Sequence, residues 1–169
     1  YIPLAMRTQN GKLTDEENLR HALCGLVSEV FEFKCEQSHN HLAAIYEAGD
    51  VCWMVAELCS YYKLGIDDNE ILPSGYIELT DTTVAKLMSH IQKTLQGTPL
   101  DLKFIRSCLV NILHETILSA CYCCDWSRQM KMSEAMERTL DLVLRRNIEK
   151  LMARYPNGFD EERSVNRDE

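Results

Sequence analysis

Residues 29–53 read EVFEFKCEQSHNHLAAIYEAGDVCW, and this segment predicts two consecutive helices. It contains two acidic pairs of the same spacing, Glu29 with Glu32 and Glu47 with Asp50. Residues three apart on a helix project from one face, and the short polar segment between the pairs predicts a turn. Two antiparallel helices joined by that turn would bring the four carboxylates together.

Apolar residues recur at helical spacing over most of the chain, and no stretch alternates as a strand would. Thr14 can cap the first helix and Glu17 completes a capping box, while Gly65 is expected to end the second helix. Trp53 and Trp126 are expected in the core or at an interface. The sequence therefore predicts an all-α protein, a bundle of about five helices. Their expected ranges are 14–36, 41–62, 81–96, 101–125 and 133–154.

The composition is typical of one globular domain. The chain has 169 residues, of which 46% are hydrophobic and 26% charged, enough to bury one core. A net charge of -8 disfavours binding to nucleic acid, which needs a basic surface. No run of eighteen apolar residues predicts a membrane span, and the first residues lack a signal-peptide pattern. The eight cysteines, mostly among apolar residues, are expected to be reduced, and the protein cytoplasmic.

Carboxylates buried between helices need a compensating positive charge. Mg²⁺ supplies that charge and takes oxygen ligands, so Glu29, Glu32, Glu47 and Asp50 are candidate metal ligands. The same residues allow an alternative in which Glu29 and Glu32 lie on a solvated face. In that alternative Glu47 and Asp50 pair with Lys or Arg.

The last predicted helix carries Asn147, Lys150 and Arg154 on one face, at spacings of three and four residues. Such a face is usually a solvated one. Opposite a metal held by carboxylates, Lys150 and Arg154 could instead bind the oxygens of a polyphosphate. This combination suits phosphoryl chemistry, in which catalysis is mostly positioning and charge neutralisation.

These residues, in this order, resemble the MazG-like all-α nucleoside triphosphate pyrophosphohydrolases. The Glu-x-x-Glu and Glu-x-x-Asp pairs look like the metal-binding signature of that family, and the flanking residues 21–29 and 47–53 resemble its first two helices. Residues 147–159, followed by Asn166-Arg167, look like its carboxyl-terminal motif. The carboxylate signature alone is loose, but together with the carboxyl-terminal motif it is specific.

The resemblance covers residues 14–66 and 138–167. The stretch between them exceeds what the shortest family members carry, so residues 67–132 are interpreted as an inserted helical pair within a single domain. This insertion would complete the bundle, alter a dimer interface or reshape the base pocket.

The resemblance implies Mg²⁺-dependent hydrolysis of a nucleoside or deoxynucleoside triphosphate to the monophosphate and pyrophosphate, with Mn²⁺ as a substitute metal. A pyrimidine deoxynucleotide is the expected substrate, and the expected role is the removal of unwanted nucleotides. Family members commonly assemble active sites between subunits, so a homodimer or higher homo-oligomer is expected. No nucleic acid or membrane partner is expected.

The resemblance also assigns individual residues. The metal ligands, which are also the catalytic carboxylates, are Glu29, Glu32, Glu47 and Asp50. The substrate-binding residues are His21, Asn147, Lys150, Arg154 and Arg167. Lys150 is also expected to take part in catalysis. Either Glu29 or Glu36 would assist proton removal, and the sequence does not decide between them.

Two other classes of protein compete with this hypothesis. A non-catalytic helical module would bind a nucleotide or a partner without turnover. A ferritin-like di-metal carboxylate protein needs a Glu-x-x-His motif on each of two helices, and the sequence offers one, Glu36 to His39. A zinc site at Cys121, Cys123 and Cys124 is disfavoured, because consecutive residues on a helix diverge.

Overall fold

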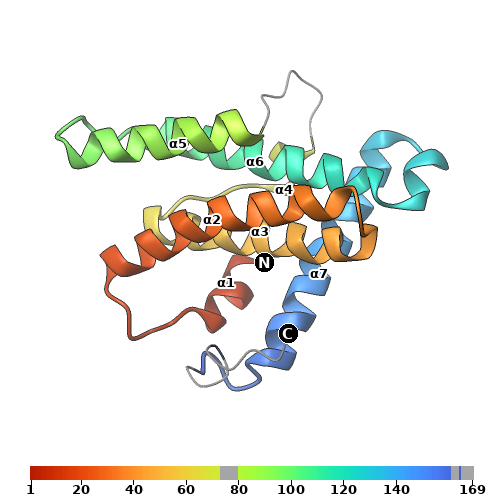
Figure 1. The fold of residues 1–169 in the computed structure, drawn as a ribbon, viewed down its shortest axis with the longest axis horizontal. Helices are drawn as coiled ribbons and strands as arrows, with labels where there is room; N and C mark the ends of the chain where they lie inside the picture. The colour runs from red at the N-terminus through yellow and green to blue at the C-terminus, as the bar shows by residue number, and fades with distance from the viewer. Residues whose placement is uncertain (73–79, 161–163, 165–169) are drawn as a thin grey trace.

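Two antiparallel helices joined by a tight turn form the first half of the fold in the computed structural model (Figure 1). α2 (Asp15–Gln37) begins at the predicted capping box, in which Thr14 accepts from the Glu17 amide and donates its own amide to the Glu17 carboxylate. α3 (His41–Tyr62) begins where the Asn40 side chain accepts two backbone amides. Both helices lie where the sequence predicts them.

The structure describes residues 1–72, 80–160 and 164. In this part of the chain there are seven α-helices, two short 3-10 segments and no strand, so the all-α prediction is confirmed. The remaining α-helices are α1 (Ile2–Ala5), α4 (Asp68–Ile71), α5 (Thr80–Leu95), α6 (Leu102–Tyr122) and α7 (Met132–Arg154). The 3-10 segments are η1 (Met6–Thr8) and η2 (Asp125–Arg128).

The helix count differs from the prediction of about five because the sequence predicted no helix before residue 14 and none between residues 62 and 81, where α1 and α4 lie. Each has four residues, too few to form a stable helix without packing, and α1 contacts α3 and α7. α6 ends at Tyr122 rather than near Asp125. α3 ends at Tyr62, and its C-cap residue Lys63 is in the left-handed region with φ 54°, so the prediction that Gly65 ends this helix is wrong.

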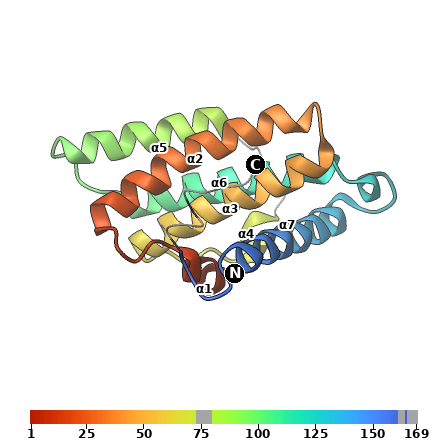
Figure 2. The same ribbon diagram turned by 60° about the horizontal axis from the view of Figure 1, so that its bottom comes forward.

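α2, α3, α5 and α6 run along the long axis of the molecule, and α7 packs on α3 and α6 on the side opposite α5 (Figure 2). α5 and α6 form a second antiparallel pair, with α5 beside α2. α1 and the amino end lie against α3 and α7. This arrangement brings the first residues of the chain to the same place as the last helix.

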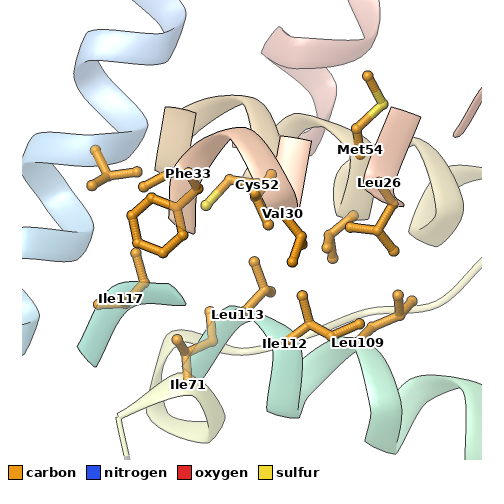
Figure 3. Packing of buried hydrophobic residues seen from close by; sticks show 14 of the residues in the cluster. Leu26, Val30, Phe33, Cys52, Met54, Ile71, Leu109, Ile112, Leu113 and Ile117 are labelled. Carbon is orange, nitrogen blue, oxygen red and sulfur yellow. The ribbon is translucent and has the colours of Figure 1, made fainter. Parts of the chain in front are cut away.

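The core lies where α6 meets the α2–α3 hairpin. Figure 3 shows side chains of α6 pointing toward those of α2 and α3. On the α6 side they are Leu109, Ile112, Leu113 and Ile117, and on the hairpin side Leu26, Val30, Phe33 and Cys52. Burying one such aliphatic side chain stabilises the fold by about 1.5–3 kcal/mol. The residues of the expected insertion therefore share one hydrophobic cluster with the hairpin.

Among the described residues one helix, α6, is by length and composition apolar enough to cross a membrane. Of its most apolar stretch, 56% is buried inside the fold. Central helices of globular proteins pass the same test, so this is weak evidence for a span.

Candidate metal centre and adjoining pocket

Three of the four predicted metal ligands meet between α2 and α3. Glu29 and Glu32 on α2 and Glu47 on α3 each offer an oxygen, and these oxygens all lie within 4.8 Å of one another. Glu32 is exposed, whereas Glu29 and Glu47 are half-buried. Carboxylate oxygens at this spacing are the donor set that Mg²⁺ and Mn²⁺ take in proteins. The residues present therefore fit a hard divalent cation.

The electrostatics of the cluster favour an added positive charge. Burial raises the pKa of Glu29 to about 7, and the negative charges of Asp50, Glu32 and Glu47 add to this effect. Burial likewise raises the pKa of Glu47, with Asp50 as the next contribution, and Lys150 opposes both shifts. The cluster is therefore poorly compensated by the protein alone.

Asp50, the fourth predicted ligand, is held by α7. Asn147 Nδ2 donates to one carboxylate oxygen at 3.0 Å, and Lys150 Nζ donates to the other. The Asp50 and Lys150 side chains are only 20% and 25% exposed. The structure thus places Lys150 on a carboxylate of the cluster, which is the arrangement that the alternative without a metal predicts for Asp50.

Gly49 permits this contact between α3 and α7. A Cβ atom at position 49 would lie 2.9 Å from Asn147 Cβ, closer than real Cβ atoms approach one another. Asn147 itself is 1% exposed. The absence of a side chain at position 49 therefore lets α7 come close enough for Asn147 to reach Asp50.

The first residue of the chain also supports Asp50. Tyr1 Oη donates to Asn147 Oδ1, so Asn147 bridges Tyr1 and Asp50. Tyr1 is half-buried, and burial together with the nearby Cys52 and Asp50 raises the pKa of its phenol far above the ordinary value. The phenol therefore stays a donor at any working pH. This segment has no helical periodicity in its sequence, and Tyr1 is absent from the predicted site.

A pocket of about 220 Å³ adjoins the carboxylates. Glu29 and Asp50 line it, as do the predicted substrate-binding residues His21 and Arg154. Its aromatic lining is Trp53, Tyr155 and Phe159. The pocket therefore combines a cationic side chain, carboxylates and aromatic walls. Arg167, also predicted to bind substrate, lies outside the described residues.

The pocket contains a buried carboxylate that the sequence analysis missed. Glu57 on α3 is 1% exposed and lines the pocket. Its Oε1 accepts from Gln9 Nε2 at 3.0 Å, and its Oε2 lies 2.9 Å from His21 Nδ1. The available signal was its spacing: Glu57 follows Asp50 by seven residues, which places both on one face of a helix.

Trp53 has a role in the pocket beyond the packing that was expected. Its indole Nε1 donates to the Ala5 carbonyl and to Thr8 Oγ1, both at 3.2 Å. Its ring meets the His21 ring edge-on, with centroids 5.8 Å apart. Trp126 instead packs against the core, as expected, and donates to Thr139 Oγ1.

The residues of the ferritin-like alternative do not converge in the described structure. His39 is exposed and its Nδ1 bonds to the Cys35 carbonyl, so it takes no part in the carboxylate cluster. Glu36 is close enough for its charge to raise the pKa of Glu47. None of the eight cysteines, all of which lie in the described residues, forms a disulfide.

Comparisons of the chain with models of protein families, with curated proteins and with solved structures find no match. The resemblance to the MazG-like family therefore stays a prediction from the motifs.

Proposed function

We propose that the protein hydrolyses a nucleoside triphosphate to the monophosphate and pyrophosphate with Mg²⁺, as a MazG-like all-α pyrophosphohydrolase. The observation that carries the proposal is the cluster of Glu29, Glu32 and Glu47 oxygens within 4.8 Å, beside a pocket lined by Arg154. The carboxylates can hold a metal ion, and the cationic side chain can bind phosphate oxygens. Both lie beside one pocket, which suits a triphosphate substrate that carries a metal ion.

Glu29, Glu32, Glu47 and Asp50 would hold the metal. Bound there, Mg²⁺ or Mn²⁺ would neutralise triphosphate charge and lower the pKa of water. A carboxylate at the edge of the cluster, Glu29 or Glu36, would accept the proton of the attacking water.

In the proposed reaction a water oxygen forms a bond to the α-phosphorus and the bond from that phosphorus to the α–β bridging oxygen breaks. The bridging oxygen leaves with pyrophosphate, and a carboxylate, Glu29 or Glu36, takes the proton of the water. Arg154 binds phosphate oxygens as a planar, permanently charged donor. Asn147 holds Asp50 in place.

The ion pair of Lys150 with Asp50 gives Lys150 two states in this scheme. Without a cation it compensates Asp50. With a cation on the carboxylates, Asp50 is compensated by the metal and the Lys150 ammonium is available to the substrate phosphates. The same ion pair favours the second candidate, a module that binds nucleotides without turnover, if Lys150 never leaves Asp50.

A homodimer fits the exposed apolar side chains near the α2–α3 turn. Phe31 is 58% exposed and Leu42 is 65% exposed, and both would be covered if the α2–α3 hairpin packed on a second copy of the chain. Light scattering should give twice the 19.5 kDa mass of one chain. A role in clearing unwanted nucleotides in the cytoplasm belongs to the same proposal.

The decisive experiment incubates the protein with the common NTPs and dNTPs, including dUTP, with and without Mg²⁺. Monophosphate and pyrophosphate are separated by chromatography, and Glu47→Gln is the variant control. Metal-dependent pyrophosphate release that Glu47→Gln abolishes would support the proposal. Release of orthophosphate and a diphosphate would mean attack at the terminal phosphorus and would refute it. Nucleotide binding without turnover would favour the non-catalytic module.

A further inference from the structure

Three elements bring polar side chains to one part of the pocket, away from the metal carboxylates. Glu57 comes from α3, His21 from α2, and Gln9 from the residue after η1. Along α3, Glu57 lies seven residues from Asp50, a rise of about 10 Å at 1.5 Å per residue. A nucleotide with its phosphates near Asp50 would therefore extend its base toward Glu57.

The Glu57 carboxylate is a hydrogen-bond acceptor held in place by its neighbours. A carboxylate has about four lone-pair positions that accept hydrogen bonds. Gln9 Nε2 and His21 Nδ1 occupy one position on each oxygen. The side chain is 1% exposed and lines the pocket, so a further donor would have to approach it from within the pocket.

The walls beside Glu57 suit a planar ring. Trp53 is fixed by two acceptors from the amino-terminal segment, Ala5 O and Thr8 Oγ1. Its indole cannot swing freely, so it offers a fixed aromatic surface within the same pocket. Aromatic side chains of this kind stack on bases without regard to sequence. Discrimination between bases must then come from polar groups.

We propose that Glu57, positioned by His21 and Gln9, selects nucleotides whose base carries an exocyclic amino group. Cytosine, adenine and guanine present such N–H donors to a carboxylate, as Glu accepts from cytosine N4 in DNA recognition. Uracil and thymine present a carbonyl oxygen where cytosine has its amino group, and two acceptors facing one another in a dry site are unfavourable. This inference rests on the proposed function, and it makes dCTP the expected pyrimidine substrate and dUTP a poor one.

The test compares kcat/KM for dCTP, dATP and dGTP with that for dUTP and dTTP. The wild-type protein should favour the amino bases by at least tenfold, since one well-made base contact is worth about 1–3 kcal/mol. Glu57→Gln keeps the size of the side chain and adds a donor, so it should lower that ratio at least tenfold. Glu134→Gln, on the exposed face of α7, is the matched control and should leave the ratio unchanged.

A second measurement separates the two proposals and needs no variant. Calorimetry with dCMP and dUMP tests the pocket even if no nucleotide is hydrolysed, and dCMP should bind at least tenfold more tightly. Absence of pyrophosphate release would refute the proposed function alone. Equal or tighter binding of dUMP, or a dCTP to dUTP ratio that Glu57→Gln leaves unchanged, would overturn the role of Glu57. A variant that fails to fold leaves the comparison of dCMP with dUMP as the deciding result.

Discussion

Asp50 and Glu57 lie two turns apart on one face of α3, and both side chains line the same pocket. Each is held by a residue from a distant part of the chain, Asp50 by Asn147 and Glu57 by Gln9. One helix thus carries an acidic group near the cluster of Glu29, Glu32 and Glu47 and a second, deeply buried one. The two are separately testable, because substitutions at one leave the hydrogen bonds of the other in place.

Adding Mg²⁺ should stabilise the folded protein. A ligand that binds only the folded state adds about 2.7 kcal/mol at a concentration one hundred times its Kd. Thermal unfolding should therefore shift upward with Mg²⁺ in the wild-type protein, and not in Glu32→Gln combined with Glu47→Gln. Glu16→Gln, an exposed carboxylate at the start of α2, should behave as wild type. An equal shift in all three proteins would argue against this metal site.

Without metal, stability should fall as the pH rises from 6 to 8. The folded-state pKa of Glu29 is raised to about 7, so in this range the folded protein binds more protons than the unfolded chain, and stability is lost as Glu29 ionises. The loss of stability between pH 6 and pH 8 should be about 1–2 kcal/mol, because solvent screens part of the charge on Glu29. Glu29→Gln should remove most of this loss. Urea titrations at pH 6 and pH 8 without divalent cations measure it. If the free energy of unfolding falls equally with pH in the wild-type protein and in Glu29→Gln, the effect belongs to another group.

Tyr1→Phe should destabilise the protein and impair the site. The substitution keeps the ring and removes the donor to Asn147 Oδ1, leaving a buried acceptor without its partner at a cost of about 1–3 kcal/mol. Because Asn147 also holds Asp50, kcat for pyrophosphate release should fall more than KM changes. Tyr61→Phe, at a ring that is 37% exposed, is the control. Identical unfolding curves for the two variants would contradict the proposed bridge.

Gly49→Ala should cost about 1–3 kcal/mol, the usual range for overpacking. The added methyl group would meet Asn147 Cβ at 2.9 Å, so α7 must shift away from α3. Gly65→Ala, where a Cβ meets nothing within 4 Å, is the control. Denaturant unfolding of both variants gives the difference, and near-equal midpoints would show that α7 adjusts without cost.

The helices of the hairpin were predictable because their signals are local. The capping box at Thr14 and Glu17 and the apolar periodicity of α2 and α3 each lie within a few residues of sequence. The same holds for the spacing of Glu29 with Glu32, which the structure completes with Glu47. Local signals of this kind predict the structure correctly when the tertiary contacts favour the same conformation.

The rest depended on contacts between distant segments. α1 is too short to be stable alone, and it forms where Tyr1 and Trp53 receive partners. Glu57 lies in a helix that reads as apolar, and its burial is tolerated because Gln9 and His21 reach it. The pairing of Asp50 with Lys150 likewise joins residues one hundred positions apart. The periodicity of a sequence does not predict contacts between residues that are far apart in the chain.

The close contact of Gly49 with Asn147 has a consequence for engineering this protein. Many enzymes lose stability where they gain activity, so selecting for one property drifts away from the other. At position 49 the absence of a side chain lets α7 pack on α3 and also lets Asn147 hold Asp50. Variants at position 49 that displace Asn147 from Asp50 should therefore also lose stability, so a screen for heat resistance should select against them.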